Sequence, residues 1–430
     1  MERIRQYFLF NDRRTDFRTE LLAGATTFLS MMYIVIVNST AFYAGGMNFG
    51  GVYIATILAT VIATLIMGIA ANYPIAVAPG LGINAYLVYV VIFSQGIPWQ
   101  QALGIAAMAA ALFTILSLTP LREMFINSIP ESLKKAIAAG IGLFITLIGL
   151  VSGHIVVDSS ATLIAIGSFE DPVLMMTLTG LFVTMVLFVL DIKGSIFIGM
   201  VVTAFAAWVL GYWTLPREIL STPIGFDKTF MQLEFDFSPT NLMIVFTILL
   251  VTLFDTTGTM LGVGQQAGLI RDGKFPNLKS ALLADSIGSL AGAFAGTGPT
   301  SAFVESGTGV AAGGRTGFAS VVTAILFLAL LFLQPIAEAV SSIPAVTAPA
   351  LILTGCFMVT DFAQIDWKDY TEAFPAFLTM IFMPFTYSIT NGVGVGMISY
   401  VILKFVTGQW RDIHPMLAIM AVLFTLQLLY

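Results

Sequence analysis

Two carboxylates stand inside long apolar stretches of this sequence. Asp255 lies in ILLVTLFDTTGTMLG, with no Lys or Arg within 15 residues on either side, and Glu305 lies in TSAFVESGTG. Placing a charged side chain at the centre of a membrane helix costs about 2.5–3.5 kcal/mol, so such residues usually belong to ion or substrate pathways. Both acids are therefore candidates for binding a polar solute. A buried carboxylate that gains and loses a proton would also couple proton movement to transport.

Each acid also has a structural explanation. Asp255 would cap a broken helix or accept a hydrogen bond from a neighbouring threonine, and Glu305 would cap a helix or pair with Arg315. Asp285 follows Lys279 by one to two helical turns, which fits a structural hydrogen-bonding role as well as a functional one. The sequence favours function for Asp255 and Glu305 and leaves Asp285 open.

Glycine and proline interrupt two apolar stretches near further polar candidates. The first interruption is NYPIAVAPGLGINAY (72–86), where Asn84 offers a donor and an acceptor, and the second is GTGPTSAFVESGTG (296–309). A half-helix that begins after the second interruption would direct free N–H groups toward a ligand. Phe303 there could stack on a flat ligand, whereas Asn38 and Gln265 are weaker candidates.

The elements that must position these residues are membrane helices. Of the 430 residues, 58% are hydrophobic and 10% are charged, against about 25% charged in soluble domains. The apolar runs are continuous and near the length of about 20 residues that spans a bilayer as a helix, which excludes the alternating runs of a β-barrel. The fifteen runs are 21–43, 51–72, 74–94, 101–119, 134–152, 172–190, 194–213, 241–264, 280–296, 299–313, 317–334, 338–358, 371–390, 392–407 and 415–430.

The distribution of basic residues supports a topology. If residues 1–20 are cytoplasmic, the first twelve runs each cross and the next two form a hairpin, only Arg217 and Lys228 of the 18 Lys and Arg residues fall outside, as the positive-inside rule favours. The polar stretch 214–240 then forms an extracellular or periplasmic connector between residues 21–213 and 241–430. Seven runs precede this connector, and an odd number predicts an inverted repeat in which the two interrupted runs correspond.

Other kinds of chemistry have little support. His154 and His414 fall in loops and Cys356 is the only cysteine, so we expect no metal site and no cofactor. The stretch 268–274 fits G-x-x-x-x-G-K, but Phe275 stands where Ser or Thr is required, and no strand precedes it. Without a nucleotide-hydrolysis motif, the sequence predicts a secondary transporter driven by an ion gradient, with no nucleic-acid partner.

Several stretches resemble a known family, the AzgA-like purine permeases of the nucleobase–ascorbate transporters. They follow one another over nearly the whole chain: TELLAGATTFLSMMYIVIVNS (19–39), APGLGINAY (78–86), IPESLKKAIAAGIGLF (129–144), LFDTTGT (253–259), SAFVESGTGVAAGGRTG (301–317), PAVTAPALILTG (344–355) and PAFLTMIFMPFTYSITNGVGVGMISY (375–400). The sequence departs from the family at Ser39, which often is proline, and in GPTSAF (298–303), where Phe303 stands in place of a frequent tyrosine.

The resemblance implies an all-α fold of about 14 membrane segments in two inverted repeats of seven, so one late pair of runs should merge. It implies a core domain of segments 1–4 and 8–11, a gate domain of segments 5–7 and 12–14, and short strands at the breaks in segments 3 and 10. It also implies proton-coupled uptake of adenine, guanine or hypoxanthine across the cell membrane, with a homodimer possible through the gate domain. Its substrate-binding residues correspond to Asn84, Asp255 and Glu305, the glycine turn to Gly82, and the base contact to Phe303.

Two other functions fit parts of the sequence. An anion transporter on the same fold should have Lys or Arg, or bare helix N-termini, at the breaks, whereas two carboxylates lie there. A membrane-embedded enzyme could use Asp255 and Glu305 as an acid–base pair, but no nucleophile motif or metal-ligand cluster supports it. We therefore expect a transporter and not an enzyme.

Overall fold

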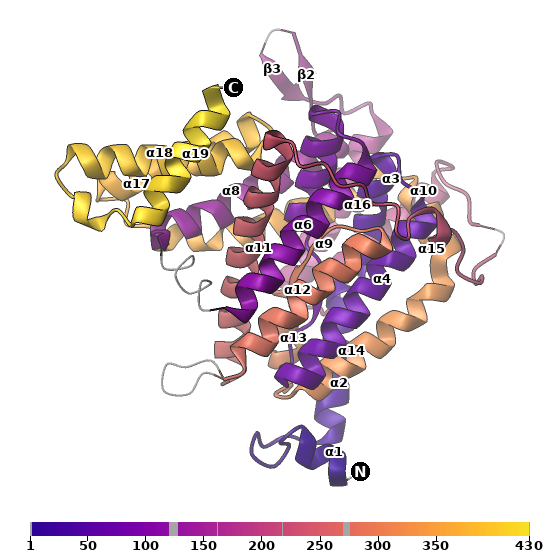
Figure 1. Ribbon diagram of the computed structural model, residues 1–430. Helices are drawn as coiled ribbons and strands as arrows, with labels where there is room; N and C mark the ends of the chain where they lie inside the picture. The colour runs from indigo at the N-terminus through magenta and orange to yellow at the C-terminus, as the bar shows by residue number, and fades with distance from the viewer. Residues whose placement is uncertain (1, 120–127, 161, 217, 270–275, 430) are drawn as a thin grey trace.

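The computed structural model describes residues 2–119, 128–160, 162–216, 218–269 and 276–429, and these are almost entirely helical. Within those ranges nine helices are long and apolar enough to cross a membrane. The predicted all-α, multi-pass membrane architecture is therefore confirmed (Figure 1). The G-x-x-x-x-G-K stretch at 268–274 lies mostly outside the described residues.

The first half of the chain follows the predicted runs, with the third run divided by its glycines and prolines. The first run of this half is one helical span, Phe17–Ala44, in which α2 and α3 meet at the helical residue Met32. The elements are α1 (Glu2–Tyr7), α2 (Phe17–Met31), α3 (Tyr33–Ala44), α4 (Phe49–Ile66), η1 (Met67–Ala71), β1 (Val77–Pro79), α5 (Leu81–Ala85), η2 (Tyr86–Ser94), α6 (Trp99–Leu118), α8 (Glu131–Ser152), β2 (Val156–Ser159), β3 (Leu163–Ile166), α9 (Pro172–Val189) and α10 (Ser195–Val209).

The second half repeats the pattern of a broken third run. Its elements are η3 (Phe226–Lys228), α11 (Pro239–Gln266), α12 (Leu278–Ala295), β4 (Thr300–Ala302), α13 (Ser306–Ala311), α14 (Gly317–Ala329), η4 (Leu330–Leu333), α15 (Gln334–Ser341), α16 (Pro344–Met358), η5 (Val359–Gln364), α17 (Tyr370–Phe385), α18 (Ile389–Val406), η6 (Trp410–Asp412) and α19 (Pro415–Leu429). The last three runs are thus three helices. A turn at 386–388 lets α17 and α18 pack against each other, so these two do not form one segment, and the merging of another late pair stays a prediction.

The two interrupted runs meet through short strands, as predicted. Strand β1 pairs antiparallel with β4, in the register Val77↔Ala302, Ala78↔Ser301 and Pro79↔Thr300. Glycine and proline keep both segments from continuing as helices, and each strand satisfies the backbone groups that the other exposes. Antiparallel pairing of corresponding segments is also the arrangement that a twofold axis in the membrane plane would produce.

The helices pack as two groups. The core group comprises α2–α6 and α11–α15 with both central strands, and the gate group comprises α8–α10 and α16–α18. Helices α17, α18 and α19 extend from one side of the molecule (Figure 1). The chain therefore brings segments from both halves into each group.

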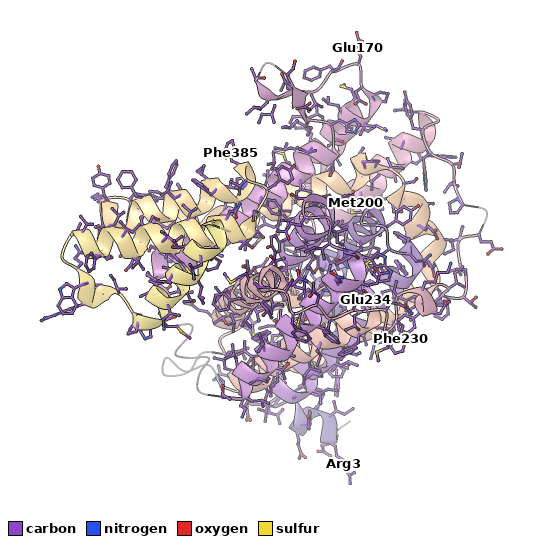
Figure 2. The ribbon with its side chains drawn as sticks, turned by 45° about the horizontal axis from the view of Figure 1, so that its top comes forward. Arg3, Glu170, Met200, Phe230, Glu234 and Phe385 are labelled. Carbon is purple, nitrogen blue, oxygen red and sulfur yellow. The ribbon has the colours of Figure 1, made fainter. Side chains whose placement is uncertain are left out.

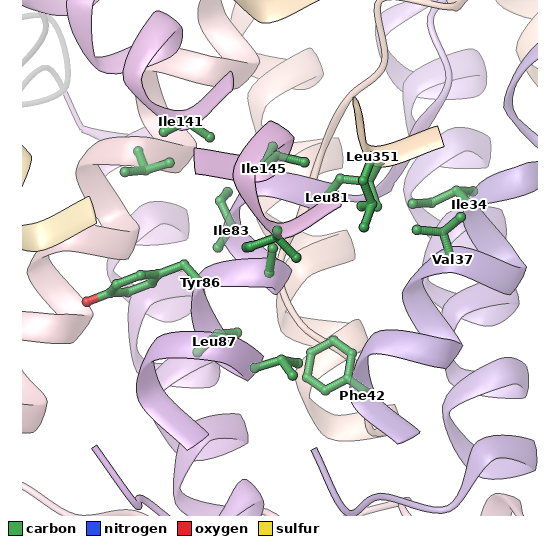
Figure 3. Close-up of a cluster of buried hydrophobic side chains, with 14 of the residues drawn as sticks. Ile34, Val37, Phe42, Leu81, Ile83, Tyr86, Leu87, Ile141, Ile145 and Leu351 are labelled. Atoms are coloured by element: carbon green, nitrogen blue, oxygen red, sulfur yellow. The ribbon is translucent and has the colours of Figure 1, made fainter. Parts of the chain in front are cut away.

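An apolar layer fills part of the boundary between the groups. Figure 3 shows Ile34 and Val37 of α3 and Leu81 of α5 on the core side, with Ile145 of α8 and Leu351 of α16 on the gate side. All five are buried. Aliphatic side chains make no directional bonds, so such a layer holds two surfaces together without fixing them in one register.

The two ends of the molecule carry different segments. Figure 2 shows Arg3 near the N-terminus and Glu170, beyond the β2–β3 hairpin, at opposite ends. The connector that follows α10 is fastened to the core group, since the Glu234 N–H donates to the Gln100 carbonyl (2.9 Å) and the Met231 N–H to the Phe294 carbonyl (2.8 Å). It lies outside the helices, as its polar sequence predicts.

Candidate substrate site

A cavity of about 520 Å³ lies between the core and gate groups. Four of the predicted residues line it, namely Gly82, Asp255, Phe303 and Glu305. Thr354 and Phe357 of the gate helix α16 line the facing wall. Residues far apart in the sequence thus meet in one space, which the sequence predicted for the two acids.

Asp255 lies in the middle of α11 and is half-buried. Because α11 continues without a break from Pro239 to Gln266, the alternative in which Asp255 caps a broken helix is wrong. Ser301 of β4 lines the same cavity. An ionised carboxylate has about four acceptor positions, which a ligand in the cavity can use.

Glu305 lies at the start of α13, but its side chain does not cap that helix. It accepts a hydrogen bond of 2.6 Å from the hydroxyl of Tyr33, which is fully buried on α3. The predicted alternative, an ion pair with Arg315, is not formed, because Nη1 of Arg315 donates to the carbonyls of Val310 and Gly314 (2.7 Å each). The Glu305 carboxylate therefore faces the cavity with one hydroxyl donor.

Gly82 and Phe303 shape the cavity wall next to the acids. A Cβ on Gly82 would lie 2.5 Å from Cγ2 of Ile141, so only glycine allows α5 to approach α8 this closely. The first intrahelical bond of α5 runs from the Asn84 N–H to the Gly80 carbonyl, so the earlier N–H groups of α5 have no acceptor within the helix. Phe303 is buried beside them, which places a flat apolar ring and backbone donors at one wall.

Asn84 lies elsewhere. It lines a second cavity of about 280 Å³, which also contains Asn38. Its amide Nδ2 donates to Oδ1 of Asn38 (2.8 Å), and Nδ2 of Asn38 donates to the hydroxyls of Thr56 and Thr297. Asn84 is 1% exposed and belongs to this internal network, so its contact with substrate stays a prediction. Leu81 lines both cavities and separates them.

Asp285 has a structural place. It is fully buried and accepts hydrogen bonds from the hydroxyls of Thr256 (2.5 Å) and Thr300 (2.8 Å), which join α12 to α11 and β4. Gln265 is exposed, whereas the next residue, Gln266, lines the first cavity and donates to the Gly307 carbonyl (3.3 Å). Sequence reasoning missed Gln266, Tyr33 and Thr354, because only the packing of the helices shows which face each residue takes.

The first cavity reaches the surface near the start of α8. Glu131, Lys134 and Lys135 line its mouth, and Lys134 forms an ion pair of 2.6 Å with the exposed Glu131. Both lysines belong to the set that the positive-inside rule assigns to the cytoplasm. The cavity therefore opens toward the side that the sequence predicts to be cytoplasmic.

Comparison with known proteins shows the family to which the chain belongs. A model described as "Permease family" matches residues 18–394. The chain belongs to this family. It is 44% identical to the guanine/hypoxanthine permease PbuO of Bacillus subtilis over 98% of this chain and 99% of that one. It is 38% identical to the adenine permease AdeP of Escherichia coli over 99% and 96%. The resemblance inferred from the motifs is thereby confirmed, and the chain is a permease and not an enzyme.

Solved structures of other transporters share the fold. The transmembrane domain of the cyanobacterial bicarbonate transporter BicA aligns with a TM-score of 0.65 at 14% identity, covering 89% of this chain and 97% of that domain. SLC26A9 aligns with a TM-score of 0.64 at 12% identity, covering 94% of this chain and 68% of that one. At such low identity the likeness shows a common fold and says nothing about the solute.

Proposed function

We propose that this permease is a secondary active transporter that takes up purine nucleobases together with protons across the cell membrane. The observation that carries the proposal is the pair of half-buried carboxylates, Asp255 and Glu305, that line one cavity between the two helix groups. The names of the permeases that align over nearly the full chain, for guanine, hypoxanthine and adenine, support purines as the solute.

The chemistry of the cavity suits a purine. A purine is flat, neutral and edged with N–H donors and ring-nitrogen acceptors. Asp255 and Glu305 would accept from ring N–H or exocyclic amino groups, and backbone N–H groups at the start of α5 would donate to a ring nitrogen or carbonyl. Phe303 would cover one face of the base. Charge-assisted bonds of this kind are stronger in a dry cavity than in water.

Transport then requires that the core and gate groups move against each other. The cavity at Asp255 opens to one side, and the second cavity, at Asn84, lies beyond Leu81. In this proposal the groups rock as two domains of an inverted repeat, with the N-terminus in the cytoplasm, and the site opens to each side in turn. Asn84 would contact substrate only after a shift of α5.

Anion transport is the runner-up, because proteins that share the fold include a bicarbonate transporter. The inner part of the cavity argues against it, since both ionisable side chains there are acidic. The basic residues Lys134 and Lys135 line only the mouth, and Lys134 is neutralised by Glu131. Unlabelled bicarbonate or sulfate should therefore leave the uptake of a labelled purine unchanged.

Replacement of Glu305 tests the proposed site. Glu305→Gln keeps the shape of the side chain and removes its charge. Loss of one charge-assisted hydrogen bond, worth about 1.5–3 kcal/mol, should lower the uptake of radiolabelled hypoxanthine, guanine and adenine by about 10- to 100-fold. The measurement is initial uptake into proteoliposomes that contain equal amounts of monodisperse protein.

Glu131→Gln is the matched control. The Glu131 carboxylate also lines the cavity, but it is exposed and paired with Lys134 at the mouth. Purine uptake by Glu131→Gln should therefore stay within about twofold of uptake by the original protein. Normal uptake of all three purines by Glu305→Gln would remove Glu305 from the site.

A further inference from the structure

Tyrosine hydroxyls cross the boundary between the core and gate groups. In each case a tyrosine of the core group has a hydrogen bond with a hydroxyl side chain of the gate group. The pairs are Tyr33 with Thr354 of α16 and Tyr86 with Thr390 of α18. Figure 3 shows Tyr86 with its hydroxyl directed away from the labelled aliphatic residues. Neutral bonds of this kind are directional and easily exchanged, so they can mark one register of the two groups.

Tyr33 differs from Tyr86 because it also contacts the proposed substrate site. Its hydroxyl lies 2.6 Å from Oε1 of Glu305 and 3.4 Å from the Thr354 hydroxyl. Glu305 belongs to the core group and Thr354 to the gate group, and both line the cavity. The fully buried Tyr33 therefore stands between the proposed binding carboxylate and the gate helix.

A tyrosine hydroxyl has a single proton to donate. In the present arrangement that proton is directed to the carboxylate of Glu305, so the Thr354 hydroxyl is the donor in the longer contact with Tyr33. A charged carboxylate is the stronger acceptor. Because hydrogen bonds in a chain polarise one another, the bond from Thr354 to Tyr33 is strongest when Glu305 is charged and weakens when Glu305 becomes neutral.

We propose that Tyr33 is a positioning residue that links the charge of Glu305 to the gate helix α16. The inference rests on the proposed function of Glu305 as the site carboxylate and adds a role for Tyr33 and Thr354. With Glu305 charged, the Thr354–Tyr33 bond strengthens and holds the cavity open to the side of Lys134. With Glu305 neutral, this bond weakens and the groups separate more easily from this register.

The test measures how often the cavity is open. Gly262 lines the cavity, and a side chain added there meets no atom within 4 Å. Gly262→Cys, in a background in which the single native cysteine is removed by Cys356→Ser, reports opening through its rate of modification by a water-soluble maleimide. The protein is full-length, in nanodiscs, and the pH is fixed.

Glu305→Gln serves as the neutral form of the acid. It should lower the modification rate at Gly262→Cys by roughly two- to tenfold, the population shift that one neutral hydrogen bond supports. In a Tyr33→Phe or Thr354→Val background Glu305→Gln should cause no such decrease, whereas in Thr354→Ser, which keeps a hydroxyl, the decrease should remain. If Tyr33→Phe does not fold, the comparison of Thr354→Val with Thr354→Ser still tests the link between Glu305 and α16.

Two controls separate a specific link from general loosening. Tyr86→Phe breaks another pair across the boundary but does not touch Glu305, so the decrease caused by Glu305→Gln should remain. Thr360 also lines the cavity, and its hydroxyl donates to the nearby Phe357 carbonyl, so Thr360→Val should leave that decrease unchanged. A decrease that persists in Tyr33→Phe and Thr354→Val overturns the link. The proposed role of Glu305 in transport is tested separately by purine uptake, and normal uptake by Glu305→Gln would overturn it.

Discussion

Glu20 illustrates what one buried carboxylate does in this fold. It is fully buried on α2 and accepts hydrogen bonds from the backbone N–H groups of Arg315 (2.8 Å), Thr316 (3.3 Å) and Ala319 (3.3 Å). These groups lie at the start of α14, where a helix has N–H donors without intrahelical acceptors and a positive dipole end. Glu20 therefore stabilises a helix that is almost 300 residues away in the sequence.

Removing that carboxylate should destabilise the protein without touching the cavity. Glu20→Ala leaves buried N–H donors without their acceptor, at a cost of about 1–3 kcal/mol. We expect a lower unfolding temperature in detergent, measured by tryptophan fluorescence. Glu338→Ala, at an exposed position on α15, is the matched control and should unfold with the original protein. Equal unfolding temperatures for both variants would contradict the capping role.

At the scale of elements, small residues decide how closely helices approach. In the gate group, a Cβ on Gly142 of α8 would lie 2.6 Å from the Gly355 carbonyl of α16, and a Cβ on Gly355 would meet the Gly142 carbonyl in turn. Contacts this short exclude any side chain on either residue. Membrane helices associate by such close approach, since lipid provides no hydrophobic force between them.

Gly355→Ala should therefore push α16 away from α8. Overpacking of this kind costs about 1–3 kcal/mol, and we expect both a lower unfolding temperature and slower purine uptake. Gly262→Ala adds the same methyl group to a helix where nothing lies within 4 Å, so its unfolding temperature should not fall. If the two alanine variants were equally stable, the close packing of α8 on α16 would not be needed.

At the scale of the whole molecule, coupling to protons requires that the acids meet water on alternate sides. The first cavity exposes Asp255 and Glu305 toward the mouth at Lys134, while the buried Leu81 lines both cavities and the buried Leu351 lines the second. A carboxylate that takes up a proton on one side of the membrane and releases it on the other would carry the proton together with the base.

Purine uptake into proteoliposomes should therefore rise when the outside is made more acidic than the lumen. The response should disappear when a protonophore collapses the gradient. Asp255→Asn and Glu305→Gln cannot exchange a proton at the replaced group, so any residual exchange of purine in these variants should not respond to the gradient. Uptake by the original protein that ignores an imposed pH gradient rules out proton coupling.

The sequence by itself determined the membrane architecture and the identity of the two acids. Long apolar runs dictate helices because lipid cannot satisfy backbone groups, and an isolated acid in such a run needs a reason to be there. The glycines and prolines at 72–86 and 296–309 predicted the two breaks, because those residues interrupt helices locally. The strands β1 and β4 at these breaks were implied by the family resemblance.

Only the tertiary structure decided which side chains share a space. It placed Asn84 of α5 beside Asn38, away from Asp255 and Glu305. It also brought Tyr33 between Glu305 and Thr354. A tyrosine or threonine in an apolar run carries no sequence signal for its partner, because the partner is chosen by helix rotation and by packing between distant segments. The two carboxylates were readable from the sequence, and the hydroxyl that joins one of them to the gate helix was not.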